Sequence, residues 1–208
     1  MAKQDITIQA PNFQVGVFKI CGTSPYVQNK FSQDTIDEMK KDQEAGSTTK
    51  KGAKRQPKDF KKLYEGSIHK STDGWIGIPT IAFRSALVSA CRVCGFQMTK
   101  AKLAVFIEPD GFEEDGTGLV KITKGKPKYF DAYVRLPKGP PDIRPRAMWS
   151  PGWEAKLKVR FDADMFTLAD VANLLARVGT QVGIGEGRND SKNSCGQGWG
   201  EFTIGAAQ

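Results

Sequence analysis

The sequence lacks several features that would assign it quickly to a class. It contains a single histidine, His69, which excludes a two-histidine acid–base mechanism within one chain. No apolar run approaches the roughly 20 residues of a membrane span, and residues 1–10 (MAKQDITIQA) lack the apolar core of a signal peptide. We therefore expect a cytoplasmic protein that does not contact a membrane. A P-loop is excluded too, because G-K-[ST] does not occur.

Cysteine is also scarce, with four residues in 208. In the cytoplasm these cysteines are expected to be reduced thiols. Cys91 and Cys94 have the spacing of a zinc or redox motif, but they lie within an apolar helical pattern and have few candidate co-ligands elsewhere. We expect no metal and no cofactor.

Positive charge is abundant, and the formal net charge is +8. Such an excess indicates a polyanionic partner, for which nucleic acid is the first candidate. The charge is concentrated in Lys50–Lys62, which carries seven basic residues and one acid. This stretch belongs to a polar insertion, 32–71, that we expect to be mobile and either ordered by RNA or DNA or simply solvated.

Glycine is concentrated near the end of the chain, where seven of the 22 glycines fall within 179–200. Glycine permits positive φ and close backbone approach, and exposed N–H groups in such a loop can bind phosphate. Gly183, Gly185 and Gly187 do not form a dinucleotide fingerprint, because their spacing is G-x-G-x-G and no helix follows. The alternative is a long connection rich in turn residues.

Hydrophobic periodicity and capping signals predict the secondary structure. A strand at 155–161 places Lys156, Lys158 and Arg160 on one face, as a basic surface for RNA or as an edge strand protected from aggregation. Leu119–Thr123 and Tyr129–Leu136 are expected to pair as a projecting hairpin, which lies with a Pro-rich connection in 109–150. The remaining elements are strands at 13–20, 102–108 and 199–204, a helix from Pro79 to Gly95, and a helix from the Thr167/Asp170 capping box to Gly179.

This order predicts a single α+β domain, 1–208, with a ferredoxin-like, RRM-like β-α-β-β-α-β palm. The connections of the palm carry side chains suited to nucleic acid. Gln28, Asn29 and Lys30 follow the first strand and could hold phosphate or form a polar turn. Arg144 and Arg146 precede Trp149, which could stack on a base or close the core.

Two segments resemble a known family. Trp75–Leu87 (WIGIPTIAFRSAL) resembles the first-helix signature of the RAMP superfamily, and 183–202 is similar to its C-terminal glycine-rich loop and last strand. The arrangement is similar to the guide-RNA-binding backbone subunits of CRISPR effector complexes. The resemblance implies that guide RNA crosses the palm and that a hairpin thumb displaces a base from each repeating segment. The short length would suit either a subunit of a larger effector or a compact, phage-borne derivative.

The expected function is a non-enzymatic ribonucleoprotein subunit, a helical filament of copies of this chain on guide RNA that presents bases to complementary target RNA or DNA. One alternative is a sequence-independent single-strand-binding protein of a phage or plasmid. Another is a metal-dependent ribonuclease that uses Asp34 or Asp37. The predicted RNA contacts are Gln28, Asn29, Lys30, Lys54, Arg55, Arg84, Ser85, Arg144, Arg146, Trp149, Gly183, Gly185, Gly187, Arg188 and Lys192.

Overall fold

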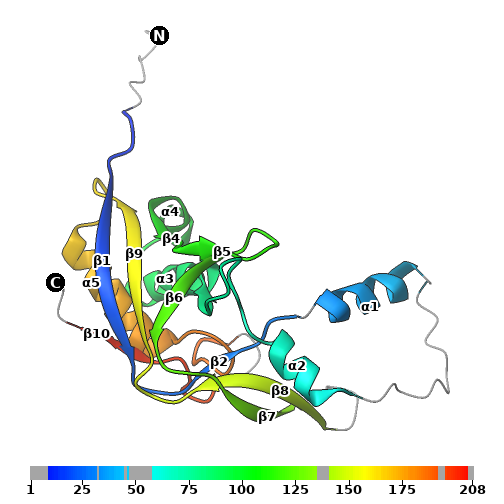
Figure 1. Cartoon of the computed structure of the whole chain (residues 1–208). Coiled ribbons are helices and arrows are strands. Elements are labelled where there is room, and N and C mark those ends of the chain that lie inside the picture. Colours follow the sequence, from blue (N-terminus) through cyan, green and yellow to red (C-terminus); the bar gives the residue numbers. More distant parts are fainter. Residues whose placement is uncertain are drawn as a thin grey trace.

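The structure is a computed structural model that describes residues 9–31, 33–44, 46, 58–134, 141–191 and 195–205. It is a mixed α+β protein with two antiparallel sheets, as the sequence predicts at this level (Figure 1). Each sheet combines strands that are far apart in the sequence, so that residues from both ends of the chain meet.

The first sheet has seven strands, and its main path runs in the order β10-β1-β9-β6-β3. β4 also pairs with β9, and β5 with β6. The bounds are β1 (Phe13–Gly22), β3 (Gly77–Pro79), β4 (Val105–Glu108), β5 (Gly111–Phe112), β6 (Gly118–Lys124), β9 (Glu154–Asp162) and β10 (Phe202–Ile204).

Helices α3 (Thr80–Val93) and α5 (Leu168–Arg177) lie behind β1 and β9 in Figure 1, and α4 (Met98–Ala104) follows α3. Alternation along β9 explains this arrangement, because Ala155, Leu157, Val159 and Phe161 are at most 1% exposed. The predicted capping box of α5 is confirmed: Thr167 accepts a hydrogen bond from the N–H of Asp170 and returns one through its own N–H. Beyond α5 a π-helical turn, Val178–Val182, ends at Gly183 rather than at Gly179.

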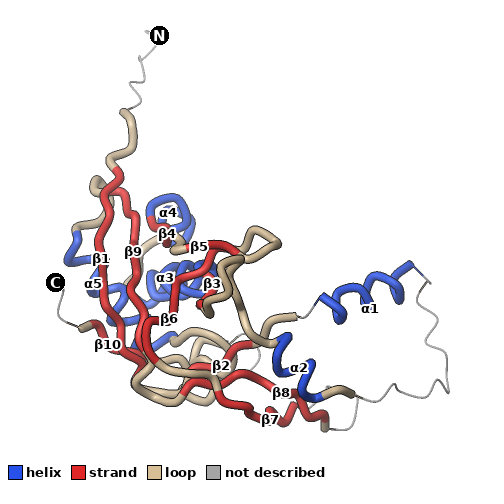
Figure 2. Tube along the Cα trace, viewed as in Figure 1, coloured by secondary structure: helices blue, strands red, loops and turns tan. Residues whose placement is uncertain are grey.

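The second sheet has three strands in the order β2-β8-β7 (Figure 2). They are β2 (Tyr26–Gln28), β7 (Lys128–Val134) and β8 (Asp142–Trp149). Helix α2 (Phe60–Gly66) lies beside β8, and the ring of Tyr64 in α2 packs in a tilted arrangement against that of Tyr129 in β7, with 5.5 Å between the ring centroids. Tyr26 connects the two sheets through the core, since its ring lies 5.4 Å from those of both Trp149 and Trp153.

The predicted hairpin of Leu119–Thr123 with Tyr129–Leu136 is wrong in its pairing. β6 pairs with β3, β5 and β9 in the first sheet, whereas β7 pairs with β8. The Pro-rich segment was expected to be a connection, but 142–149 forms a strand. Pro145 is accommodated in β8 because β2 pairs only with Ala147–Trp149 and leaves this part of β8 at the sheet edge.

The segment expected to be a mobile insertion, 32–71, contains regular structure in its described part. Helix α1 (Gln33–Glu44) projects from the body, and α2 follows the residues that the structure does not describe (Figure 1). Ser67, Ile68 and Ser71 are buried, so the end of this segment belongs to the core. Apolar side chains contributed by distant strands give Ile68 a place to pack, which the local composition of the segment does not reveal.

Candidate nucleic-acid interface

The glycine-rich loop after α5 is a packed part of the fold. Its backbone bonds to β2 and to the preceding residues: Glu186 donates to the carbonyl of Val27 at 3.0 Å, and Gly200 donates to that of Pro25 at 2.7 Å. A Cβ on Gly200 would lie 1.8 Å from the carbonyl oxygen of Ile184, and one on Gly185 would lie 2.6 Å from that of Val27. Positive φ and close approach therefore explain these glycines without a ligand.

This packing corrects part of the predicted phosphate contact. Gly183 is buried, and its N–H is used by a 2.7 Å bond to Val178, so it cannot meet RNA in this conformation. Gly185 and Gly187 remain half-exposed, and Arg188, which directly follows Gly187, is exposed. The Arg188 guanidinium donates to the carbonyl of Gly185 at 3.2 Å, which positions the cation over the loop.

A cleft of about 390 Å³ separates β7 from the glycine-rich loop. Phe130 of β7 meets Trp199 of the loop edge-to-face, with 5.6 Å between the ring centroids. Tyr133 lies at the same cleft and is 79% exposed, the most exposed large hydrophobic side chain of the described residues. The exposed ring of Tyr133 offers stacking, and Arg188, which follows the lining residue Gly187, offers charge close to the cleft. These are the two interactions by which single strands are bound without sequence preference.

Arg146 of β8 connects the hairpin formed by β7 and β8 to the glycine-rich loop. Its Nε lies 2.6 Å from Oε2 of Glu186, and the Arg146 side chain is 9% exposed. In the register of β7 with β8, Phe130 is opposite Arg146 and Ala132 is opposite Arg144, so these four side chains share one face. The structure thus holds Arg146 against the glycine-rich loop, but this predicted RNA contact is buried and paired with Glu186, so it does not reach RNA in this conformation.

A second cavity, of about 260 Å³, lies on the α2 side of β8. Asp142 binds both Lys58, at 2.5 Å, and Arg144, at 3.4 Å, and the hydrogen bond from Lys58 is the main cause of the lowered pKa of Asp142. Because one carboxylate faces two cations, this cavity keeps positive charge near the hairpin. It is lined by Asn29, Lys30, Phe31, Thr35, Lys58, Leu63, Ile143, Arg144, Pro145 and Arg146.

Lys30 reaches from this cavity to a buried carboxylate. Its Nζ lies 2.7 Å from Glu113, whose side chain is 2% exposed, and the other Glu113 oxygen lies 3.1 Å from Nδ1 of His69. Burial lowers the pKa of His69 below its usual value, although the hydrogen bond to Glu113 opposes this effect. The cluster fixes the end of β2 against the turn between β5 and β6.

Two predicted RNA contacts belong to the core instead. Gln28 is 2% exposed, and its amide donates to the Gly77 carbonyl and accepts from the His69 N–H. Trp149 is 1% exposed and packs on Tyr26, so its indole cannot stack on a base in this conformation. All three residues of β2 and the last part of β8 are buried where these strands pair, and this burial could not be predicted before the pairing was known.

The remaining predicted residues lie elsewhere. Arg84 and Ser85 are on α3, in a groove beside α4 rather than at the hairpin. Lys54, Arg55 and Lys192 fall outside the described residues. The aromatic residues Phe130, Tyr133 and Trp199 were not predicted as contacts. For Phe130 and Tyr133 the signal was the aromatic-rich segment 128–134 (KYFDAYV), whose meaning depended on the pairing of this strand.

The basic side of β9 does not form a free cationic surface. β9 is a central strand with β1 on one side and β4 and β6 on the other, so the edge-strand interpretation is wrong. Lys158 pairs with Asp110 at 2.9 Å, and Arg160 pairs with Glu108 at 2.5 Å. The guanidinium of Arg160 also stacks between Phe13 and Phe106. Because of these pairs, the open face of the first sheet, which α3 and α5 do not cover, is a weaker candidate for a phosphate-binding site than the hairpin of β7 and β8.

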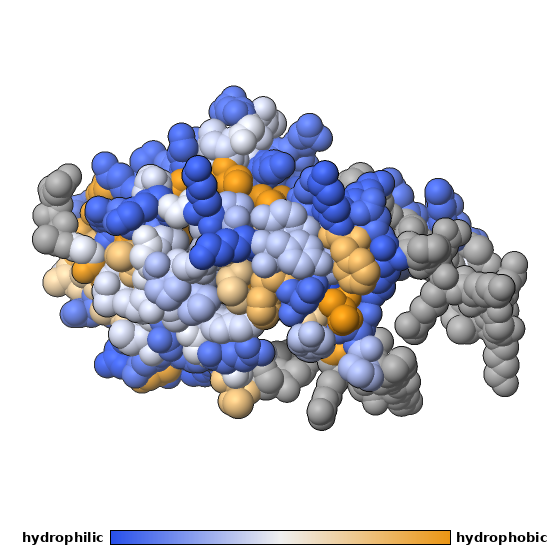
Figure 3. All heavy atoms as spheres, turned by 60° about the horizontal axis from the view of Figure 1, so that its bottom comes forward, coloured by the Kyte–Doolittle hydropathy of each residue, from blue (hydrophilic) through white to orange (hydrophobic). Residues whose placement is uncertain are grey.

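Figure 3 turns the side of the molecule with the β7–β8 hairpin towards the viewer. Hydrophobic side chains reach this surface in small groups among hydrophilic ones, without one continuous apolar patch. Such a mixture suits a ligand that offers both rings and charges.

Cysteine and acidic residues show no metal cluster in the part of the chain that the structure describes. Cys91 is buried on α3, whereas Cys94 is exposed at the end of that helix, outside the apolar helical pattern predicted for both cysteines. Asp37 lies on α1, 3.8 Å from Lys40. Among the described helices, none combines the length and hydrophobicity of a membrane span.

Comparison with known proteins adds no family assignment: no protein-family model matches the chain, and no curated protein matches its sequence.

Proposed function

We propose that this chain is a non-catalytic RNA-binding protein that oligomerises along a guide RNA and presents the bases for pairing with target RNA or DNA. In this proposal it is a compact member of the RAMP superfamily, similar to the backbone subunits of CRISPR effector complexes. The protein would hold the backbone of the guide while base pairing supplies sequence specificity.

The cleft between β7 and the glycine-rich loop is the observation that carries the proposal. It is lined by the exposed ring of Tyr133 and by the Phe130–Trp199 pair. The exposed cation of Arg188 follows the lining residue Gly187 on the same loop. Bases can stack on the rings while the guanidinium neutralises phosphate, and neither interaction selects a sequence. This chemistry is what a guide-binding subunit needs, since it must accept any guide.

The order of elements supports the proposed palm. The chain contains, in this order and with other elements between them, β1, α3, β4, β9, α5 and β10. The four strands lie in the sheet in the order β10-β1-β9-β4, and both helices lie on one face of it. A ferredoxin-like β-α-β-β-α-β unit would have this arrangement. The β7–β8 hairpin is then the thumb of the proposal, in place of the one expected at Leu119–Leu136.

The two segments that carry the resemblance occupy structurally related positions. Trp75–Leu87 spans β3 and the first half of α3, and the glycine-rich loop leads into β10. The loop touches α3 through Asp190, which lies 2.7 Å from Arg92. The two segments that carry the resemblance are therefore in contact with each other in the fold.

The test is to purify the protein from cells that contain its neighbouring genes and to sequence the RNA that it retains. The proposal predicts a particle much larger than one chain with a discrete RNA that carries repeat-derived ends. Heterogeneous nucleic acid would favour a general single-strand-binding protein. A monomer without nucleic acid would contradict both.

A further inference from the structure

Helix α1 combines acidic charge with exposed apolar side chains. Gln33–Glu44 contains five acidic residues and two lysines, a net charge of −3 within a chain of +8. Phe31 just before the helix is 60% exposed, and Met39 within it is 49% exposed. Figure 1 shows α1 extending away from both sheets, and among the described elements it has no extensive contact with another helix or strand.

An acidic helix with exposed apolar groups is a poor ligand for RNA, because its charge repels phosphate. The combination instead suits a protein surface that is apolar in its centre and basic at its margin. A chain of net charge +8 can offer such a surface to another copy of itself.

The groove between α3 and α4 has these properties. Its volume is about 350 Å³, and its lining includes Ile81, Val88 and Met98 together with Arg84 and Lys102. Ile81 is 58% exposed, an unusual exposure for an apolar residue in the first turn of a core helix. No carboxylate is among the lining residues of this groove in the described chain.

Arg84 shapes one wall of the groove. It donates through Nη2 to the carbonyl of Lys102 at 2.6 Å and lies over the ring of Phe106, while its buried Nε has no partner among the described residues. A guanidinium held in this way offers fixed positive charge to an acidic group. The role predicted for Arg84 was RNA binding, but Arg84 lines the α3–α4 groove and does not line the cleft between β7 and the glycine-rich loop.

We propose that α1 of one copy docks into the α3–α4 groove of the next copy, with Met39 on Ile81 and the negatively charged helix near Arg84 and Lys102. This inference rests on the proposed function in one respect, because it supplies the contact that joins successive copies along the RNA. Charge complementarity between a helix of net charge −3 and a groove with two cations and no acid selects this occupant.

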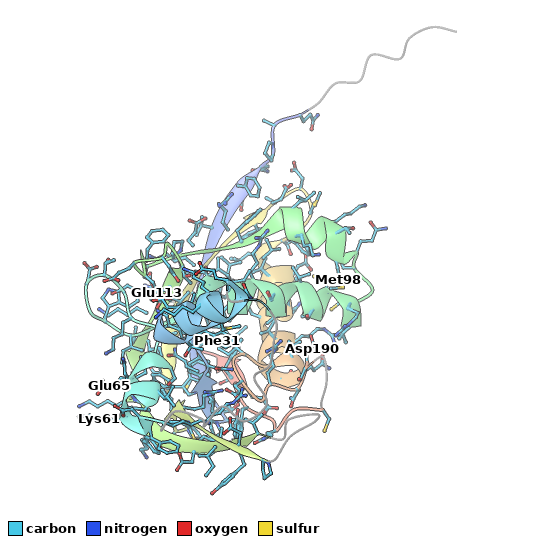
Figure 4. All side chains as sticks on the ribbon, turned by 90° about the vertical axis from the view of Figure 1, so that its right-hand side faces the viewer. Phe31, Lys61, Glu65, Met98, Glu113 and Asp190 are labelled. Carbon is cyan, nitrogen blue, oxygen red and sulfur yellow. The ribbon has the colours of Figure 1, made fainter. Side chains whose placement is uncertain are left out.

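The positions of the two surfaces favour an open chain. In Figure 4, Phe31 at the start of α1 and Met98 in the groove lie well apart on the body. Each copy therefore presents its helix in one direction and its groove in another. A contact between two different surfaces is heterologous, and repeating it builds a helix or filament unless the rotation closes a ring.

The first experiment uses cysteine cross-linking in the full chain. The exposed native cysteines Cys94 and Cys195 are replaced by serine, and Met39→Cys is combined with Ile81→Cys in one chain. Treatment with a short bifunctional maleimide is expected to give a ladder of covalent oligomers. The matched control places the second cysteine at Met165, which is 44% exposed next to α5, and should give no ladder.

The second experiment measures self-association of variants that retain the fold. Ile81→Asp and Lys102→Glu, both at exposed positions, are each expected to weaken association about tenfold or more, whereas Met165→Asp should leave it unchanged. Unchanged melting temperatures would show that these substitutions do not act through unfolding. Association equal to that of the original chain in both groove variants would overturn the docking proposal.

Binding of an RNA too short for two copies separates the two proposals. If the groove variants bind this RNA normally but fail to assemble on a longer one, both proposals are supported. Normal binding with no ladder would overturn the docking proposal alone, and a ladder that stops at dimers would overturn the open chain. If the original chain does not bind the short RNA, the proposed function is overturned, whatever the cross-linking shows.

Discussion

Arg146 of β8 and Glu186 of the glycine-rich loop form an ion pair with 2.6 Å between Nε and Oε2, and this pair connects two segments separated by 40 residues in sequence. The Arg146 side chain is 9% exposed and that of Glu186 is 26% exposed. The pair lies between the cleft on the β7 side and the cavity on the α2 side, because Arg146 lines the cavity and Glu186 lines the cleft. It therefore holds β8 against the glycine-rich loop, and each side chain neutralises the charge of the other.

Breaking this pair should destabilise the fold. Glu186→Gln leaves the nearly buried guanidinium without its anion, and we expect a loss of about 1–3 kcal/mol in the free energy of unfolding. Arg146→Met should cost a similar amount. The double variant should lose less than the sum of the two, with a coupling of about 1 kcal/mol or more in urea denaturation. Additive losses would show that the pair contributes nothing, and Arg144→Met serves as the matched control.

Tyr133→Ala should weaken RNA binding without changing stability. The side chain is 79% exposed, so its removal should alter the free energy of unfolding by about 0.5 kcal/mol or less. Loss of one stacking platform should raise the Kd for single-stranded RNA by roughly 5- to 100-fold. Fluorescence anisotropy provides the measurement, with Phe112→Ala, 52% exposed on β5, as the control. Equal affinity in the two variants would remove Tyr133 from the site.

Arg188→Ala should reduce both the affinity for RNA and its dependence on salt. A cation that neutralises one phosphate contributes about 0.7 to the slope of log K against log salt on a single strand. The slope for Arg188→Ala should therefore be shallower by about this amount. Arg177→Ala, at an exposed arginine of α5, should keep the original slope. A parallel line for Arg188→Ala would mean that this side chain does not contact phosphate.

Trp149 should affect stability rather than recognition. Because the indole is 1% exposed, Trp149→Ala should cost about 3–5 kcal/mol through the cavity that it leaves. Trp149→Phe keeps most of the packing and should remain folded at room temperature with unchanged RNA affinity. A large loss of affinity in folded Trp149→Phe would restore the stacking role predicted from the sequence.

His69 should make stability fall on mild acidification. Burial lowers its pKa in the folded protein below the value of about 6.5 that it has when unfolded, so the unfolded chain takes up a proton more readily. The contribution of neutral His69 to the free energy of unfolding is complete above about pH 6.5 and is lost as the pH falls through the pKa of His69 in the folded state. His69→Asn should lose less stability than the original chain between about pH 7.5 and 5.5. Parallel losses in denaturant titrations would contradict this.

Local sequence patterns predicted those strands and helices that can be recognised without knowing which other elements they contact. The alternation of Ala155–Phe161 indicated a strand with one buried face, and Thr167 with Asp170 indicated a helix start, because a capping box is satisfied within four residues. Both predictions are confirmed. The order of strands in the first sheet could not be assigned in this way, because pairing joins residues far apart in the chain.

The candidate site was less predictable for the same reason. Gln28 and Trp149 looked like contacts beside turns, but the pairing of β2 with β8 buries both. Pro145 suggested a connecting segment, but it lies in β8. A proline is tolerated there because this part of β8 is at the edge of its sheet, a position that the sequence does not reveal. The glycines in 179–200 indicated a phosphate-binding loop, whereas several of them allow close backbone contacts within the fold.

The central claim is that RNA lies in the cleft between β7 and the glycine-rich loop. Photo-cross-linking of single-stranded RNA that contains 4-thiouridine, followed by identification of the modified peptides, tests this claim most directly. The account predicts cross-links in 129–134 and 187–199, with Tyr133 among the modified residues. Cross-links confined to the open face of the first sheet, around Phe13 and Phe106, would contradict it.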